Sequence, residues 1–433
     1  MKTVIMAGGK GTRISSVAAD IPKPMIRIQG RPVLEHEIIC LREQGFTDLI
    51  ITVSHLSHVI MDHFGDGKQF GVSIQYYEEK EPLGNAGALF KLRSQLDDDF
   101  LLLNADSIFD IDFNRFVDFH RSRKGLVTLF SHPNSHPYDS GLLISDSNCV
   151  VQKWLSKEDM RPQWYKNRVN AGLHVINPAA LDLVGIDSDS IGKCIDGSIV
   201  KVDLDRQVLK PLCGTGQMYC YDSPEYVKDM GTPERYAAVC RDFSSGKVNS
   251  KNLHHKQRAV FLDRDGTVNR HVGFLNDVDK FELLPHVSEA IKRINSEGYL
   301  AIVITNQPVI ARGELSILAL ETIHNKMETL LGMEGAYLDG IYYCPHHPHK
   351  GFDGEIPELK INCECRKPKA GLFFRAAQDF NIDLSQSWMI GDGENDVKAG
   401  KTAGCKTILL GNDNYGQDFT DDSLYGAVAH IFS

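Results

Sequence analysis

The chain has 433 residues, of which 42% are hydrophobic and 24% are charged, and its net charge is −10. This balance is typical of a globular protein with two or three domains. The acidic charge argues against non-specific nucleic-acid binding, which requires a basic surface. No apolar run reaches the roughly 18 residues of a membrane span, and residues 1–6 contain no apolar signal core. We therefore expect a cytoplasmic protein with neither a nucleic-acid nor a membrane partner.

Short apolar segments alternate with amphipathic segments along the whole chain. This alternation predicts parallel sheets covered by helices, as in doubly wound α/β folds. A polar stretch without apolar periodicity, 242–257, separates two such parts and predicts a linker between domains 1–241 and 258–433. The expected strands are 49–53, 100–103, 126–130 and 169–176 before the linker, and 259–262, 300–304, 340–343, 388–390 and 407–410 after it, with a helix over 287–296.

A glycine-rich loop directly follows the first apolar segment. Residues 6–13 read M-A-G-G-K-G-T-R, and a P-K-P string with Lys23 at its centre comes soon afterwards. The glycines let backbone N–H groups approach a phosphate closely, and Arg13 can bind two phosphate oxygens in a fork. A glycine turn beside a surface lysine is the simpler alternative, but the complete string favours a phosphate site.

These strings resemble the signature of nucleoside-triphosphate:sugar-1-phosphate nucleotidyltransferases, and the resemblance covers roughly residues 1–240. It implies a Rossmann-like domain in which the glycine loop and its arginine hold the triphosphate. It also implies that Lys23 stabilises the transition state. The residues implicated around the phosphates are Gly8, Gly9, Gly11, Thr12 and Arg13.

Further strings agree with this resemblance. The string P-L-G-N-A-G at 82–87 is similar to the base-contacting loop, where threonine is usual at the asparagine position, and N-A-G at 170–172 is similar to the sugar-binding loop. Asp106 in L-N-A-D and Asp229 in D-M-G-T-P-E are placed like two Mg²⁺ ligands, whereas ordinary turn or capping aspartates are the alternative. The implied ligands of the nucleotide and the sugar phosphate are Leu83, Gly84, Asn85, Lys157, Asn170 and Gly172.

The implied reaction joins two polyanions. An oxygen of the sugar 1-phosphate attacks the α-phosphorus of the nucleotide, and pyrophosphate leaves. Mg²⁺ on two carboxylates, together with lysine and arginine, offsets the charge repulsion. The strings I-P-K-P-M, G-R-P-V-L-E and F-G-D-G are similar to the heptose-1-phosphate guanylyltransferase branch, which implies GTP. The spacing itself does not distinguish guanine from uracil or cytosine.

The second half begins with a pair of aspartates. D-R-D-G-T at 263–267 follows the apolar segment 259–262 and resembles the haloacid-dehalogenase-type phosphatases over roughly residues 258–433. The resemblance implies a Rossmannoid fold in which Asp263 attacks phosphorus and becomes an aspartyl-phosphate. Asp265 then protonates the leaving alkoxide and later deprotonates water. A calcium or structural loop is the alternative.

Other residues with suitable chemistry follow successive strands of this half. Asp392 is expected to join Asp263 and the backbone carbonyl of Asp265 on Mg²⁺, while Asp396 is either a supporting acid or a helix N-terminal charge. Only about 40 residues separate Asp263 from Thr305, which leaves no room for a lid domain and predicts an uncapped phosphatase. The expected phosphate-binding residues are Thr305, Asn306, Arg312, Arg366 and Lys367.

Two close pairs of sulfur and nitrogen ligands predict a zinc loop in this half. Cys344-Pro345-His346 is followed by Cys363-Glu364-Cys365, which suits a closed tetrahedral zinc site. Cys365 directly precedes Arg366, so a structural zinc would anchor the loop that presents the cations. Two chance pairs are the alternative, and the alternative histidine ligands are His347 and His349. The six cysteines before residue 250 are scattered, so we expect no disulfide framework.

The predicted zinc loop (the metal loop below), together with T-N-Q at 305–307 and A-R-G at 311–313, resembles the heptose-bisphosphate and histidinol-phosphate phosphatases. This chain has P-V at 308–309, where serine-glycine is usual. Arg312 would then bind the distal phosphate of a bisphosphate, unless it is a solvated loop arginine.

Together the two halves predict a bifunctional enzyme. Its phosphatase would convert D-glycero-D-manno-heptose 1,7-bisphosphate into the 1-phosphate, and its transferase would use GTP to make GDP-heptose and pyrophosphate. The alternatives are the same chemistries on another sugar phosphate or nucleotide, a histidinol-phosphate-type phosphatase, or an inactive sensor or scaffold half. We expect Mg²⁺ in both sites, structural Zn²⁺, and sugar phosphates and a nucleoside triphosphate as partners. The sequence does not decide whether the chain forms a homo-oligomer.

Overall fold

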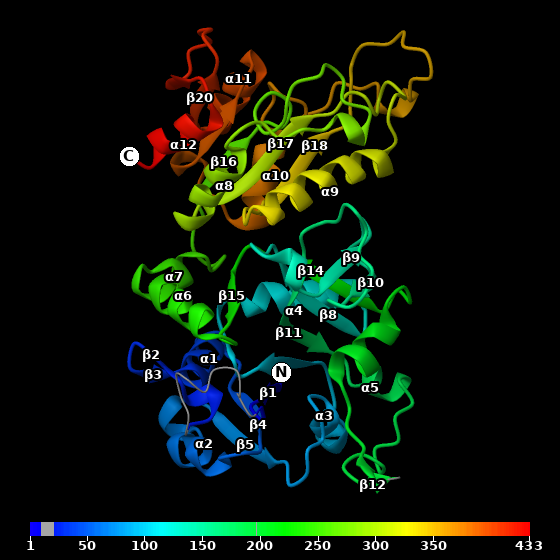
Figure 1. The fold of residues 1–433 in the computed structure, drawn as a ribbon, viewed down its shortest axis with the longest axis vertical. Helices are drawn as coiled ribbons and strands as arrows, with labels where there is room; N and C mark the ends of the chain where they lie inside the picture. Colours follow the sequence, from blue (N-terminus) through cyan, green and yellow to red (C-terminus); the bar gives the residue numbers. More distant parts are fainter. Residues whose placement is uncertain (10–20, 196) are drawn as a thin grey trace. The chain divides into compact units, whose positions relative to one another are not determined.

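The computed structural model of the chain describes residues 1–9, 21–195 and 197–433 (Figure 1). Residue contacts divide it into two units. The first comprises 1–131, 143–154 and 170–252, and the second comprises 132–142, 155–169 and 253–433. Within the described ranges, no helix combines the length and the apolar character needed to cross a membrane.

A nine-stranded mixed sheet forms the centre of the first unit. Its strand order is β10-β9-β11-β6-β1-β4-β5, with β8 pairing with β11 and β14. The neighbours β6, β1, β4 and β5 are parallel, so their carboxyl ends meet at one edge, while β11 runs antiparallel to β6. The strands are β1 (Thr3–Met6), β4 (Asp48–Val53), β5 (Ser73–Glu78), β6 (Phe100–Asn104), β8 (Val127–His132), β9 (Leu142–Ser145), β10 (Val151–Leu155), β11 (Val169–Ile176) and β14 (Met218–Asp222).

Both faces of this sheet are buried. Successive strand residues point to opposite faces, and Val4 and Leu102 accordingly belong to one apolar cluster while Ile5 and Leu103 belong to another. The first cluster includes residues of α3 and α5, and the second includes residues of α1 and α4. The helices are α1 (Val33–Glu43), α2 (Ser57–Phe64), α3 (Gly87–Lys91), α4 (Phe113–Arg123), α5 (Ala179–Leu183), α6 (Pro233–Ser244) and α7 (Lys247–Ser250).

Short elements complete the first unit. The two-residue strands β2 (Arg27–Ile28) and β3 (Arg31–Pro32) pair, as do β12 (Cys194–Ile195) and β13 (Ser198–Ile199). β7 (Ser107–Asp110) pairs with β15 (Tyr226–Asp229), and a π-helix spans Leu204–Leu209. The end of α6 and all of α7 fall inside the stretch expected to be a linker, so the chain is helical there despite its polar composition.

The second unit contains a six-stranded parallel sheet with the order β18-β17-β16-β19-β20-β21. The chain starts in the centre of this sheet, moves outward on one side and then returns to the other, which is the doubly wound arrangement. The strands are β16 (Ala259–Leu262), β17 (Leu300–Asn306), β18 (Gly340–Cys344), β19 (Trp388–Gly391), β20 (Lys406–Leu410) and β21 (Phe419–Asp421).

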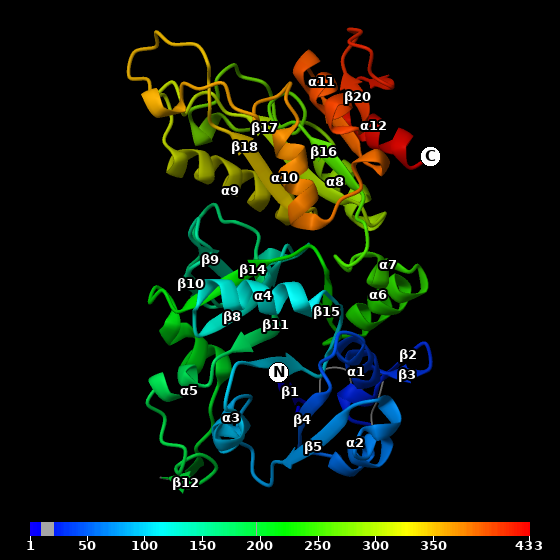
Figure 2. The same ribbon diagram turned by 180° about the vertical axis from the view of Figure 1, so that it is seen from behind.

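Helices cover both faces of this sheet as well. Val260 and Leu262 of β16 share a cluster with α8, α9 and α12, whereas Ala259 and Phe261 share one with α10 and α11. Accordingly α9 lies on the near face in Figure 1 and α10 on the near face in Figure 2. The helices are α8 (Val287–Ser296), α9 (Ile317–Met333), α10 (Gly371–Phe380), α11 (Glu394–Ala403) and α12 (Leu424–Ile431).

The α/β fold class is confirmed in both units, and each strand expected from the sequence is present within one or two residues of its predicted ends. The helix predicted over 287–296 is α8. Between β16 and β17 lie a 3-10 helix (Val278–Lys280) and α8, and no lid domain is inserted in this fully described stretch.

Candidate active sites

A cavity of about 620 Å³ opens at the carboxyl edge of the first sheet. Its lining takes residues from the ends of four neighbouring strands: Gly8 after β1, Ser54 after β4, Glu79 after β5 and Asp106 after β6. Ligands of open α/β sheets bind outside these strand ends. The cavity is therefore the candidate nucleotide site.

Most residues of the described nucleotide loops reach this cavity. Gly8, Gly9, Lys23, Gly84 and Asn85 all line it. Leu83 does not line the cavity, because its side chain lies in the hydrophobic core, so its nucleotide contact stays a prediction. The predicted residues Gly11, Thr12 and Arg13 lie outside the described residues.

Lys23 and Asp106 form a close ion pair at one end of the cavity. Lys23 begins a 3-10 helix (Lys23–Met25) that follows Pro22, and its Nζ lies 2.6 Å from Asp106 Oδ2. The lysine side chain is 10% exposed and the aspartate side chain 41% exposed. The pair thus places a cation beside a carboxylate that still faces the cavity.

Asp229 lies next to this pair without lining the cavity. β15 places Asp229 opposite Ser107, and the backbone N–H of Met230 donates to the carbonyl of Asp106 at 3.1 Å. Arg235 Nη1 holds both carboxylate oxygens of Asp229, at 2.9 and 2.7 Å. Burial raises the pKa of Asp229, but Arg235, the Gly231 N–H and Lys23 together outweigh burial and lower it below its ordinary value.

Two adjacent carboxylates are an oxygen donor set of the kind that Mg²⁺ prefers. Asp106 and Asp229 fit that ion, provided that it competes with Lys23 and Arg235 for their oxygens.

The predicted sugar loop lies on the other side of β6. Because β11 is antiparallel to β6, its first residues lie at the carboxyl end of β6. Gly172 has φ +78°, and an added Cβ would lie 2.7 Å from Asn104 Nδ2, so only glycine fits there. Asn170 Oδ1 accepts the Gly172 N–H at 3.2 Å. Lys157 is exposed and does not line the cavity, so its role stays a prediction.

The base-loop segment is tied to residues far along the chain. Val202 N–H donates to the Leu83 carbonyl at 2.8 Å, and Ala86 N–H donates to the Val202 carbonyl at 3.0 Å. Asn85 Oδ1 accepts from Leu204 N–H at 2.7 Å, at the start of the π-helix. The asparagine therefore fixes the loop rather than only facing a ligand.

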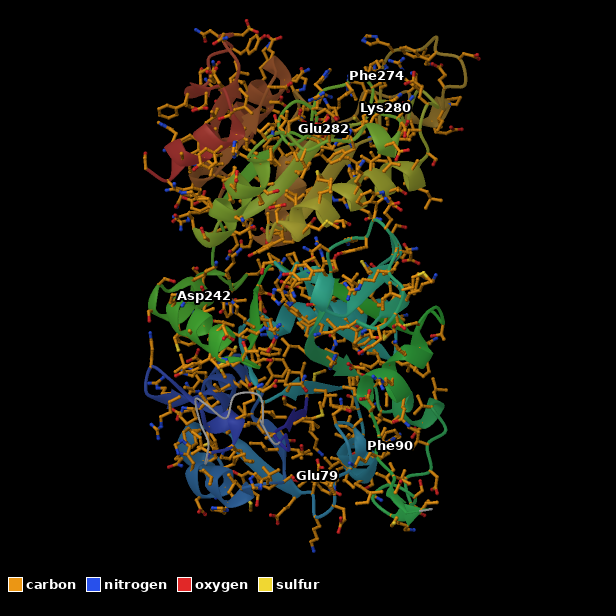
Figure 3. The ribbon with its side chains drawn as sticks, in the orientation of Figure 1. Glu79, Phe90, Asp242, Phe274, Lys280 and Glu282 are labelled. Carbon is orange, nitrogen blue, oxygen red and sulfur yellow. The ribbon has the colours of Figure 1, made fainter. Side chains whose placement is uncertain are left out.

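Glu79 was missed by sequence reasoning. It follows β5 directly and is labelled in Figure 3. Its Oε2 accepts weakly from Leu83 N–H at 3.5 Å, and burial raises its pKa. A carboxylate immediately after a strand at this edge was the available signal. Ser54 and Lys201 also line the cavity and were not predicted.

Asp263 and Lys367 form the centre of the second site. Asp263 follows β16, and Lys367 Nζ lies 2.6 Å from its Oδ1, 2.6 Å from Asp396 Oδ1 and 2.8 Å from the Ile304 carbonyl. Burial opposes the charge of Lys367, but the two carboxylates outweigh it and raise its pKa. Burial also raises the pKa of Asp263, against the attraction of Lys367.

Asp263, Asp392 and Asp396 converge closely enough to share a metal ion, with one oxygen of each within 4.8 Å of the others. Gly266 has φ +92°, and an added Cβ would collide with the carboxylate of Asp392, so glycine is required. Asp396 Oδ2 also accepts from Gly393 N–H at 3.1 Å. Asp396 thus pairs with Lys367 and also caps the N-terminus of α11, so it combines the two expected roles of supporting acid and helix N-terminal charge. The three carboxylates fit Mg²⁺.

Asp265 is held by hydrogen bonds rather than left open. Arg264 Nη2 lies 3.0 and 2.7 Å from its two oxygens, Asn269 Nδ2 donates at 3.0 Å, and Gln307 Nε2 donates at 2.9 Å. Burial raises the pKa of Asp265, but Arg264 and the amides together lower it below its ordinary value. Its carboxylate is therefore ionised and fixed in the resting enzyme.

The predicted phosphate residues divide into two groups. Thr305 and Lys367 lie at the site, with the Thr305 hydroxyl accepting from Gln307 Nε2 at 2.9 Å. Asn306 instead clasps the backbone of Lys367, accepting from its N–H at 3.0 Å and donating to its carbonyl at 3.1 Å. Arg366 donates to the His346 carbonyl at 3.2 Å, which ties it to the metal loop.

Arg312 is enclosed by aromatic rings. Its guanidinium lies 4.0 Å from the ring centre of Phe274, labelled in Figure 3, and 4.3 Å from that of Phe352. Glu314 pairs with it at 2.6 Å. Stacking of this kind fixes the plane of a guanidinium, so Arg312 is not a freely solvated arginine.

The predicted zinc ligands come together. Sγ of Cys344 lies 3.5 Å from Cys363 Sγ and 3.2 Å from Cys365 Sγ, and His346 Nδ1 lies 3.2 Å from Cys365 Sγ. A tetrahedral zinc with Zn–S of about 2.3 Å separates its ligand atoms by about 3.5–3.8 Å. The separations that involve Cys365 are a few tenths of an ångström shorter than this, but the sulfur and nitrogen donors are those that zinc prefers. His347 and His349 are not part of the cluster.

Arg264, Gln307 and His324 form a buried group that sequence reasoning did not select. Arg264 is fully buried, and its Nη2 also donates to Gln307 Oε1 at 3.0 Å. Its Nη1 donates to His324 Nε2 at 3.3 Å. Burial, assisted by Arg264, lowers the pKa of His324 to about 3, so the ring is neutral and accepts this hydrogen bond.

The folds and sites define two classes of enzyme in one chain: a Rossmann-like nucleotidyltransferase and a phosphatase with an aspartate at the end of its central strand. A model of the nucleotidyl transferase family matches residues 2–244, and a HAD-hydrolase-like model matches residues 364–427. The chain belongs to the nucleotidyl transferase family and, through a second domain, to the family of the heptose-1,7-bisphosphate 7-phosphatases.

Two curated relatives and two solved structures illustrate these similarities. The β-heptose 7-phosphatase of Haemophilus ducreyi is 44% identical over 155 residues, which are 36% of this chain and 82% of the relative. The α-heptose 7-phosphatase of Burkholderia mallei is 41% identical over 155 residues, which are 36% of this chain and 80% of the relative.

HddC from Yersinia pseudotuberculosis, a solved structure, is 24% identical with a TM-score of 0.46 over 56% of this chain and 99% of HddC. The D,D-heptose 1,7-bisphosphate phosphatase of B. bronchiseptica is 29% identical with a TM-score of 0.36 over 41% of this chain and 98% of that protein.

Proposed function

We propose that the chain removes the 7-phosphate from D-glycero-D-manno-heptose 1,7-bisphosphate and then transfers GMP from GTP to the resulting 1-phosphate. The observation that carries the phosphatase half is the group of Asp263, Asp265 and Lys367, in a chain that covers most of the length of relatives named for this substrate. The product of that step is a sugar 1-phosphate, which is the substrate class of the other half. The proposed domains are 1–241 and 258–433.

In the phosphatase, Asp263 Oδ attacks phosphorus. Lys367 stabilises the negative charge on the Asp263 carboxylate and on the phosphoryl group. The Thr305 hydroxyl lies at the same strand edge and holds a phosphoryl oxygen. Asp265, ionised in the resting enzyme, takes up the proton of the bound phosphate monoanion, gives it to the leaving sugar oxygen and afterwards accepts one from the attacking water. Bound Mg²⁺ would supply charge neutralisation and would be held by Asp263, Asp392 and the backbone carbonyl of Asp265, with Asp396 close by.

Arg312 supports a bisphosphate substrate. Its guanidinium is fixed between Phe274 and Phe352, and a second phosphate could replace Glu314 as its anion. An arginine in a fixed plane can bind a phosphate through two parallel hydrogen bonds.

In the transferase, Lys23 and the glycine loop bind the phosphates of the nucleotide. The ion pair of Lys23 and Asp106 supports a position for the α-phosphorus near the end of β6. The sugar loop at Asn170 lies beyond β6, on β11, so the nucleoside must extend the other way, past β1 towards β4 and β5. Mg²⁺ held by Asp106 and Asp229 would neutralise the triphosphate and the sugar phosphate.

Glu79 supports guanine as the base at that end of the cavity. Glu79 lines the cavity directly after β5, at the end where the base would lie. A carboxylate only accepts hydrogen bonds, and guanine offers it two adjacent donors, N1–H and the 2-amino group. Uracil offers one N–H between two carbonyl oxygens that repel a carboxylate.

A structural Zn²⁺ is proposed to bind the cluster of Cys344, His346, Cys363 and Cys365. Free thiols of this kind and a nucleotide substrate agree with a reducing cytoplasm as the place of action.

A product assay tests this function. The purified chain is given each anomer of the heptose 1,7-bisphosphate with each nucleoside triphosphate in turn. We expect phosphate release followed by GDP-heptose with GTP alone. Phosphate release from histidinol phosphate without turnover of any heptose would refute the proposal.

A further inference from the structure

Arg264 is the residue between the two aspartates of the D-R-D-G-T string, and its side chain is completely buried. A buried guanidinium is stable only where its N–H groups find acceptors. Arg264 meets Asp265, Gln307 and His324, while its Nε donates to no group among the described residues. Asp265 is the carboxylate that Arg264 contacts, Gln307 also donates to this carboxylate, and His324 accepts from Arg264 Nη1.

Gln307 connects Asp265, the proposed acid, with Thr305, the proposed phosphate ligand. Its Oε1 accepts from Arg264 at 3.0 Å, and its Nε2 donates to Asp265 Oδ2 and to Thr305 Oγ1, both at 2.9 Å. The side chain of Gln307 is 2% exposed, so water does not compete for these bonds. One amide thus spans the proposed acid and the proposed phosphate ligand.

We propose that Arg264 and Gln307 are positioning residues that aim the carboxyl group of Asp265 at the leaving oxygen of a phosphate ester. This inference rests on the proposed phosphatase function. Arg264 holds the carboxyl group in place because its Nη2 contacts both carboxyl oxygens. Gln307 fixes the distance of this group from the phosphoryl group held by Thr305.

The step that depends on this alignment is the cleavage of the ester. Asp265, which is ionised in the resting enzyme, first takes up the proton of the bound phosphate monoanion. Asp263 Oδ then forms a bond to phosphorus, the bond between phosphorus and the ester oxygen breaks, and that oxygen takes its proton from Asp265. Water then attacks the aspartyl-phosphate, gives its proton to Asp265 and releases inorganic phosphate. An alkoxide needs the proton when it leaves, whereas p-nitrophenolate is stable without it.

The test compares Arg264→Lys and Gln307→Leu on two substrates, the heptose bisphosphate and p-nitrophenyl phosphate. The quantity compared is kcat/KM, which reports the steps up to departure of the leaving group. We expect it to fall by about 100-fold or more for the sugar ester, the scale of general acid catalysis, but less than about 5-fold for the aryl ester. Arg270→Lys, at the exposed Arg270, is the matched control and should change neither.

A double-variant cycle shows whether Arg264 acts through Asp265. Asp265→Asn sets the size of the lost acid catalysis, and Arg264→Lys added to it should cause little further loss, because coupled residues are not additive. Equal losses on both esters, or additive losses in the cycle, would overturn the inference. If Arg264→Lys does not fold, judged by circular dichroism, Gln307→Leu carries the same comparison. A wild-type chain that releases phosphate from neither ester would instead refute the proposed function.

Discussion

A lysine ammonium lies 2.6 Å from a strand-end aspartate in each unit: Lys23 beside Asp106 and Lys367 beside Asp263. Both pairs occur where a phosphoryl group must be bound and where charge builds up during transfer. The two lysines differ in support. Lys367 is buried and contacts two carboxylates and a carbonyl. Lys23 is paired with one carboxylate, that of Asp106, whose side chain is 41% exposed. The transferase pair is thus the more readily rearranged when substrates arrive.

Glu79→Gln tests the base preference at the level of one residue. ITP lacks only the 2-amino group of GTP, so the wild-type chain should prefer GTP over ITP by about 10- to 100-fold, the value of one hydrogen bond to a charged group. The variant should reduce this preference to within a few-fold of one, because an amide cannot accept from both donors. Nucleotide-sugar formation with each triphosphate measures the ratio. Glu78→Gln, at the neighbouring residue, is the control, and an unchanged ratio in Glu79→Gln would exclude Glu79 as the base reader.

Among the elements, the π-helix Leu204–Leu209 contains a buried carboxyl group that lowers the stability of the fold near the nucleotide cavity. Asp205 lies on this helix, where burial and the nearby Asp203 raise its pKa to about 6. An unfolded aspartate has a pKa near 3.9. Between about pH 4 and pH 6 the folded chain therefore binds more protons than the unfolded chain, and the free energy of unfolding falls as pH rises.

Asp205→Asn should remove this dependence. We expect the variant to be more stable than the wild-type chain at pH 7.5, by up to about 3 kcal/mol at about 1.4 kcal/mol per pKa unit, and equally stable at pH 4. Thermal melting at the two pH values measures the difference. The exposed residue Asp97 provides the control, Asp97→Asn. A variant that is less stable at pH 7.5 would show that Asp205 is ionised and favourably paired.

The metal loop offers a second test among the elements. Cys363→Ser removes one of four ligands, so zinc content should fall from about one ion per chain to near zero. Phosphate release should fall by about 10-fold or more, because Arg366 and Lys367 follow the loop directly. Cys194→Ser, at an exposed cysteine of the first unit, should change neither. Full activity without bound metal would exclude a structural role for zinc.

The sequence predicted what is local and missed what depends on distant contacts. Apolar strands and the chemistry at their ends, such as Asp263 after β16, were readable because the motif and the strand are contiguous. The buried group around Arg264 joins residues 43 and 60 positions away, and no local pattern reveals such a meeting. Leu83 and Asn306 illustrate another limit: both belong to motifs, but one packs in the core and the other clasps a backbone.

At the scale of the whole molecule, each unit places described candidate catalytic groups at the edge of its own sheet: Lys23 and Asp106 in the first, and Asp263 and Lys367 in the second. Asp263→Asn should therefore abolish phosphate release while the chain still forms the nucleotide sugar from heptose 1-phosphate and GTP. Lys23→Ala should lower that transfer by about 100-fold or more and leave phosphate release intact, so that heptose 1-phosphate accumulates. Paired assays on the two purified variants check both statements. Loss of both activities in either variant, with its fold preserved, would contradict independent sites.

Cys365 is joined to Lys367 through a single residue, and this continuity has a physiological consequence. If the cysteine cluster holds zinc as proposed, oxidants that modify thiolates, or starvation for zinc, would act on the loop that carries Lys367 and not on the cavity beside Lys23. The two activities should then separate under stress: nucleotide sugar would still be made from any 1-phosphate already present, while new 1-phosphate would stop arriving. Flux through the chain would thus respond to the thiol and metal status of the cell at its first step.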